Sequence, residues 1–75
     1  MFILSIRNAD HVRDYSIQSA GASGWEVSVQ EDRRVCQQVR YHDWHRVERA
    51  IAAIEREVGH LTARGWRVVR RHTRA

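Results

Sequence analysis

Arginine side chains gather at the C-terminal end of this chain of 75 residues. Residues 64–75 contain five arginines and no acid, whereas residues 1–63 hold eight arginines against nine acids. The planar guanidinium group forms paired hydrogen bonds with phosphate oxygens, and basic chain ends commonly bind nucleic acid. The pattern predicts phosphate contacts from Arg64, Arg67, Arg70, Arg71 and Arg74. The alternative is a solvated tail that only aids solubility.

A second candidate surface is a polar sheet face. Between residues 16 and 40, polar side chains alternate with apolar ones, which would place the polar set on one side of the strands. The set is Ser16, Gln18, Glu26, Ser28, Gln30, Cys36, Gln38 and Arg40, with Arg34 at its edge. Glu26 offsets Arg40, so this face is nearly neutral. We expect Arg34 and Arg40 to assist the C-terminal arginines in binding DNA or RNA, and a solvated face without a partner is the simpler alternative.

Metal binding and catalysis find little support. His42 and His45 flank Trp44, but zinc needs three or four converging ligands, and no second ligand pair accompanies them. Cys36 with a histidine could form a nucleophile and base, yet it falls on the predicted outer face of a strand, away from any cleft. No glycine-rich phosphate loop or serine elbow is present. The sequence therefore favours a non-enzymatic protein without metal or cofactor.

One helical pattern positions these groups. Within residues 43–65, apolar side chains recur at spacings of three and four, which places them on one stripe of a helix: Trp44, Val47, Ile51, Ile54, Val58 and Leu61. Asp43 suits the N-cap, and Gly65 suits a left-handed residue after the helix. We predict that the stripe packs on a sheet. A coiled-coil dimer seam is the alternative, since it uses the same spacing.

Alternating apolar and polar residues predict the strands of that sheet. They fall at about residues 2–7, 12–20, 25–30 and 35–41, and residues 21–24 form a glycine-containing turn. The fold class is α+β: an antiparallel meander of three to four strands with the helix on one face. Trp66 and Val68 predict a short strand beside the first one. Trp25, Trp44 and Trp66 are expected in the core rather than as base-stacking platforms, with Trp44 the most exposed.

The length of the chain allows one compact domain, predicted at residues 1–69, with residues 70–75 as a flexible basic tail. The single cysteine and the lack of a leader-like or membrane-length apolar segment favour the cytoplasm and no membrane partner. Two binding functions stay open. One is nucleic-acid binding through the arginines. The other is a protein-interaction or homodimer module that uses sheet edges, for which FILSIR at 2–7 and WRVV at 66–69 are the candidates.

Overall fold

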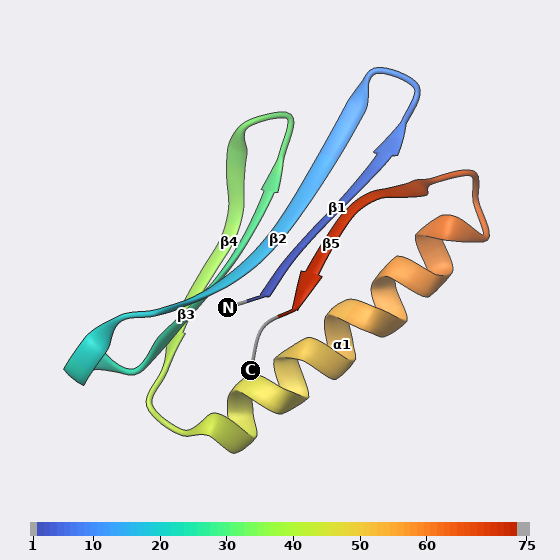
Figure 1. Cartoon of the computed structure of the whole chain (residues 1–75). Helices are drawn as coiled ribbons and strands as arrows, with labels where there is room; N and C mark the ends of the chain where they lie inside the picture. The colour runs from blue at the N-terminus through green and yellow to red at the C-terminus, as the bar shows by residue number, and fades with distance from the viewer. Residues whose placement is uncertain (1, 74–75) are drawn as a thin grey trace.

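The computed structural model describes residues 2–73, which form five strands and one long helix (Figure 1). The elements in chain order are β1 (Phe2–Asn8), β2 (His11–Ser19), the 3-10 turn η1 (Gly21–Ser23), β3 (Trp25–Glu31), β4 (Arg34–Tyr41), α1 (Trp44–Thr62) and β5 (Arg67–Thr73). The strands form one antiparallel sheet in the order β4-β3-β2-β1-β5. The helix packs on one face, so the predicted α+β fold and the strand after the helix are confirmed.

The core lies between α1 and the sheet face that it covers. Its buried members are Phe2, Leu4, Ile6, Tyr15, Ile17, Val27 and Val29 from the sheet and Val47, Ile54 and Val58 from the helix. Burial of each large apolar side chain contributes about 1.5–3 kcal/mol, so this contact dominates the stability of the fold. The predicted helical stripe therefore serves the core of its own chain.

The less buried members of the stripe complete this packing. Ile51 and Leu61 are half-buried against the core, as are Trp25 and Trp66. Trp44 is 46% exposed and meets the ring of Trp25 edge-on, with 5.2 Å between the ring centroids. Trp44 is the most exposed of the three tryptophans, as expected, but it lies outside the core in which all three were predicted.

A polar network ties α1 to the middle of the sheet. The buried Tyr15 hydroxyl donates to Glu57 Oε2 at 2.7 Å. Burial, together with this hydrogen bond to a carboxylate, raises the pKa of Tyr15 far above its ordinary value. Arg13 lies 3.5 Å from both Glu31 and Glu57 and 5.6 Å above the Tyr15 ring. Glu57 is thereby held in place over the strands.

Side chains and backbone conformation together fix the element ends. The Asp43 carboxylate accepts the His45 N–H at 2.9 Å, which confirms the predicted N-cap. The helix ends at Thr62, and Gly65 adopts a left-handed φ of 104° in the connection to β5. In the reversal between β3 and β4, Asp32 and Arg33 both have positive φ. Two left-handed residues match the twist of a tight hairpin, so this turn forms without glycine.

The edge strands and the C-terminal segment differ from the expectations. The segment FILSIR is not a sheet edge, because β1 pairs with β2 on one side and with β5 on the other. The edges of the sheet in residues 2–73 are β4 and β5. Residues 70–73, assigned to a flexible tail, lie in β5 instead, where backbone pairing with β1 orders them. Arg74 lies outside the described residues.

None of the helices in residues 2–73 combines the length and the apolar character that crossing a membrane requires.

Candidate nucleic-acid interface

The register of β5 divides its arginines between the two faces of the sheet. Arg67 pairs with Arg7, and Arg70 pairs with Ser5, on the face that points away from α1. Residues three apart in a regular strand point to opposite faces. A bulge at Val69 adds one residue to β5, so that Arg67 and Arg70 share the outer face.

Four side chains meet at this corner of the outer face. We call Arg7, Arg67, Arg70 and His72 the β1–β5 basic cluster; all four are exposed. His72 pairs with Ile3, next to Arg70 on the same side of β5. Within residues 2–73, none of the four takes part in an ion pair. Apart from the Nε–H of Arg7, the arginine donors of the cluster therefore remain available to an anion.

Two polar groups at this corner already form hydrogen bonds within the protein. The Arg7 Nε–H donates to the Ala9 carbonyl at 3.0 Å, which leaves its terminal nitrogens free to bind elsewhere. Asp14, one strand further across the sheet, accepts the Ser5 hydroxyl proton at 2.5 Å. Asp14 is the acid of the outer face nearest to Arg70, because both pair with Ser5. The hydrogen bond from Ser5 occupies one of its two carboxylate oxygens.

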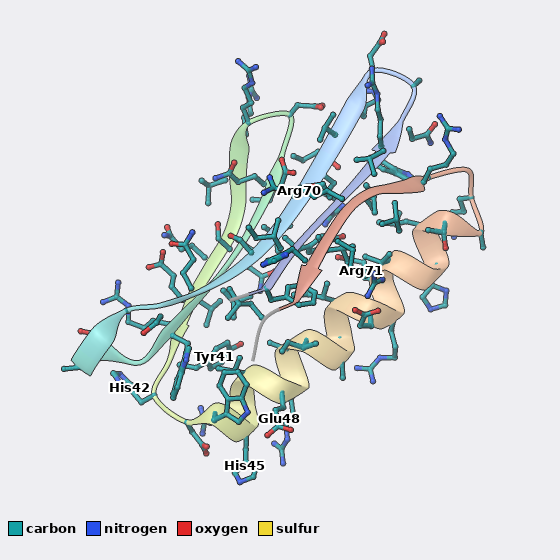
Figure 2. The ribbon with its side chains drawn as sticks, in the orientation of Figure 1. Tyr41, His42, His45, Glu48, Arg70 and Arg71 are labelled. Atoms are coloured by element: carbon teal, nitrogen blue, oxygen red, sulfur yellow. The ribbon has the colours of Figure 1, made fainter. Side chains whose placement is uncertain are left out.

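Arg71 points the other way. It pairs with Leu4 on the inner face, and its two terminal nitrogens lie 2.9 and 3.4 Å from the carboxylate oxygens of Glu55 on α1. Figure 2 shows Arg71 between β5 and the helix, whereas Arg70 leaves the opposite side of β5, over β1 and β2. Arg71 is therefore a structural link from β5 to α1 rather than a free cation.

Arg34, Arg40 and Arg64 are not part of the cluster. Arg40 lies 3.0 Å from Glu26, which also accepts a hydrogen bond from Gln38 at 2.8 Å. These two hydrogen bonds, from Gln38 and then Arg40, lower the pKa of Glu26. Arg34 begins the opposite edge strand, across from Glu31. Arg64 is exposed in the connection from α1 to β5. The structure brings together Arg67 and Arg70 but not Arg34, Arg40 or Arg71.

The strand register confirms the predicted polar face except at the start of β4. There the bulge at Cys36 places Val35 opposite Gln30 on the outer face, and Arg34 pairs with Glu31 in the register of the side that faces α1. Ser16 lies opposite Ser28, and Ser28 lies opposite Gln38. The same row continues through Ile3 to His72, because β1 and β5 complete the sheet. The polar face and the C-terminal arginines are therefore parts of one surface. The polar face is nearly neutral only over β2, β3 and β4; the arginines of β1 and β5 make the whole surface basic.

Arg7 and His72 were not identified as site residues from sequence. A signal for Arg7 was present, because it alternates with the buried residues Leu4 and Ile6 and so must share a face with Ser5. His72 gave no comparable signal, because its face depends on the bulge at Val69 and on pairing with a strand more than sixty residues earlier.

Within residues 2–73, the histidines near the start of the helix are not grouped with further metal ligands. Figure 2 shows His42 and His45 apart from each other, and His45 lies 3.7 Å from Glu48. Across residues 2–73, no three His, Cys, Asp or Glu side chains are grouped to hold a metal ion. Cys36 is exposed, and its thiol lies 3.6 Å from the Arg34 carbonyl oxygen.

Comparison with known proteins gives no match: no family model, no curated protein and no solved structure is similar to this chain.

Proposed function

We propose that this protein is a non-enzymatic module that binds the phosphate backbone of double-stranded nucleic acid through the outer face of its sheet. The β1–β5 basic cluster makes the principal contacts. The observation that carries the proposal is the register of β5, which places Arg67 and Arg70 beside Arg7 on one exposed surface.

The charge balance of the outer face supports this proposal. Its positions include four arginines, Arg7, Arg40, Arg67 and Arg70, against the acids Asp14 and Glu26. Glu26 is matched by Arg40, and Asp14 accepts the Ser5 hydroxyl. The positive charge left over lies at the β1–β5 corner. Phosphate contacts of this kind supply most of the affinity of sequence-independent binding.

The distribution of aromatic rings favours a duplex over a single strand. Proteins that bind single strands usually stack the bases on exposed aromatic side chains. Here Tyr15 and Trp25 occupy strand positions that face α1, and Phe2 is buried beside them. The outer face of residues 2–73 offers serine, glutamine and arginine instead, which suit contacts with phosphates and groove edges.

Two adjacent arginines provide the test. Arg70→Ala removes a charge from the outer face, and Arg71→Ala removes the same charge from the inner face. With fluorescence anisotropy on a labelled 20-base-pair duplex of mixed sequence at low salt, Arg70→Ala should weaken binding about 5- to 30-fold, the equivalent of about 1–2 kcal/mol. Arg71→Ala should leave the affinity nearly unchanged and lower the free energy of unfolding by up to about 1 kcal/mol, because an exposed ion pair is lost.

The comparison separates this surface from a general effect of charge. Equal losses of affinity in the two variants would indicate that only net charge matters. No detectable binding of the wild-type protein at low salt would contradict the proposal. A single-stranded oligonucleotide of the same length should bind more weakly than the duplex, and tighter binding would contradict the duplex assignment.

A further inference from the structure

Strand β4 forms the edge of the sheet opposite β5, and its outer side carries no partner strand within residues 2–73 (Figure 1). A bulge lies near its start, at Cys36, and the pairing with β3 is regular from residue 37 to residue 41. The backbone N–H and C=O groups on the open side of such a segment are a template for another strand. Five residues of regular edge are therefore available for pairing.

The inner face of this edge is incompletely covered by α1. A groove of about 190 Å³ separates the helix from β4 and is lined by Val27, Val29, Val39, Tyr41, Ala50 and Ala53, among others. Val39 and Tyr41 are only half-buried. The groove stays open toward β4 because the helix presents the small side chains Ala50 and Ala53 there, while Ile54 closes its inner end and is buried in the core. Apolar surface is left open beside an unpaired strand edge.

The sequence of the edge is complementary to itself. If two copies of residues 37–41 pair antiparallel around Val39, this valine lies opposite Val39 of the partner subunit. Gln37 then faces Tyr41 of the partner subunit on the groove side, because residues 37, 39 and 41 share that face. On the outer side, Gln38 faces Arg40 of the partner subunit. No like charges stand directly opposite each other, so this pairing avoids a destabilising arrangement.

The charges along α1 fit the same arrangement. On the side of the helix near the groove, Arg46 and Arg49 lie toward the N-terminal end and Glu57 lies nearer the other end. In an antiparallel dimer, the arginines of one copy approach the end of the groove that carries Glu57 of the partner subunit. Opposite charges are thus brought together, which favours this orientation over others.

We propose that a second copy of this chain pairs with β4, antiparallel and centred on Val39, so that the two sheets join into one of ten strands and the two grooves close against each other. The surface is separate from the β1–β5 basic cluster, which lies at the far edge of each sheet. Small domains commonly gain stability from such association, because a chain of this length buries only about 60% of its unfolded surface.

Light scattering on the full chain tests the proposal. The wild-type protein should be a dimer at micromolar concentration, at both low and high salt. Val39→Glu places two carboxylates on the symmetry axis and should raise the dimer dissociation constant more than about 100-fold, because opposed like charges cost several kcal/mol. Val69→Glu is the matched control: Val69 is 55% exposed on the other edge strand, and the dimer should persist. Circular dichroism verifies that both variants fold.

Cross-linking gives an independent readout that does not depend on a destabilising change. In a Cys36→Ser background, Val39→Cys places one thiol beside the same thiol of the partner subunit. Directly opposed residues of paired strands have the Cα separation of about 4.4–6.8 Å that a disulfide requires. Oxidation should convert most of this protein into a covalent dimer. Cys36 of the wild-type chain lies three residues from the axis and should cross-link poorly. A wild-type monomer, a dimer unaffected by Val39→Glu, or equal cross-linking through the two cysteines would overturn the proposal.

Discussion

Gly24 directly precedes β3, and its backbone lies close to the backbone at the end of β4. It has a φ of 95°, and a Cβ at this position would lie 2.2 Å from the Tyr41 carbonyl oxygen. Gly24→Ala should therefore lower the free energy of unfolding by about 3 kcal/mol or more, because backbone strain and a clash with backbone atoms add. Urea denaturation followed by tryptophan fluorescence measures the change.

Gly21 is the control for this substitution. Its φ is 63°, and a Cβ there meets nothing within 4 Å. Gly21→Ala should cost only the strain of a left-handed alanine, about 1 kcal/mol. Equal losses at the two glycines would show that the contact with Tyr41 does not determine the requirement for glycine at position 24.

The pair His11 and Asp32 joins two hairpins at the same end of the sheet. His11 Nδ1 lies 2.8 Å from Asp32 Oδ2, and the other oxygen accepts the Val12 N–H at 2.9 Å. The hydrogen bond to Asp32 raises the pKa of His11 above 6.5. The hydrogen bond from His11, followed by that from Val12, lowers the pKa of Asp32 below 3.8.

These directions fix the pH window in which the pair stabilises the fold. The contribution of His11 is complete below pH 6.5 and is lost as the pH rises through its raised pKa. The contribution of Asp32 is complete above pH 3.8 and is lost as the pH falls through its lowered pKa. The difference in urea midpoint between wild type and His11→Ala should be largest between these values and shrink above pH 6.5. In an Asp32→Asn background the pH dependence should become much smaller, because only the charges of Glu31 and Asp10 still raise the pKa of His11. An undiminished pH dependence there would assign it to another group.

At the level of whole elements, patterns local in sequence were enough to predict the helix, its cap at Asp43 and the strands before it. Each depends on side chains within about one turn of helix or a few residues of strand. The role of β1 was not predictable in the same way. Whether FILSIR is an edge or an interior strand depends on a segment that arrives more than sixty residues later. A run of buried residues looks the same in either place.

In the candidate site, too, local patterns predicted part of the arrangement, and pairing between distant segments determined the rest. Alternation placed the serines and glutamines of residues 16–40 on one face, and composition identified the arginines near the C-terminus. The face to which each of those arginines belongs depends on the bulge at Val69, which no local pattern marks. As a result Arg70 and Arg71, which look equivalent in sequence, have different roles: one is exposed on the outer face and the other pairs with Glu55.

Helix α1 contains one glycine whose replacement by alanine should stabilise the fold. Gly59 lies in its last turns, and a Cβ there would meet nothing within 4 Å. Its carbonyl accepts hydrogen bonds from Ala63 and from the Thr62 hydroxyl, and both are kept if a methyl group is added. Gly59→Ala should raise the free energy of unfolding by about 0.5–1 kcal/mol.

Thermal unfolding measures this gain, and Ala52→Gly is the reverse control. Ala52 is exposed in the middle of the same helix, and its replacement should cost a similar amount. A loss of stability in Gly59→Ala would mean that the glycine meets a requirement other than helix propensity.

For the molecule as a whole, the fold separates two surfaces. The outer face carries the basic cluster at the β5 edge, and the groove opens at the β4 edge. Joined through β4, two copies would present one continuous outer face with a basic cluster at each end. Nine strand spacings separate the two β5 strands, roughly 43 Å before twist is considered. This is comparable to one turn of duplex, about 34–36 Å, so one duplex lying across the strands could contact both clusters.

The salt dependence of duplex binding tests how many phosphates are contacted. Each contact lowers the log–log slope of affinity against salt by about 0.9. Three arginines, Arg7, Arg67 and Arg70, predict a slope near −2.7 for one chain, and two clusters acting together predict about −5.4. Contacts from all five C-terminal arginines, as the sequence alone suggested, would give about −4.5, but they would require Arg71 to exchange Glu55 for a phosphate.

Variants then assign the slope to its source. If the dimer binds as one unit, Val39→Glu should bring the slope from about −5.4 to about −2.7 without touching the outer face, and Arg70→Ala should reduce it by about 0.9 per chain. If single chains bind, Val39→Glu should leave a slope near −2.7 unchanged, while Arg70→Ala still reduces it. Because Arg71 is held on the inner face, Arg71→Ala should leave the slope unchanged in both cases, and a reduction there equal to that of Arg70→Ala would refute the division of the two arginines between the faces.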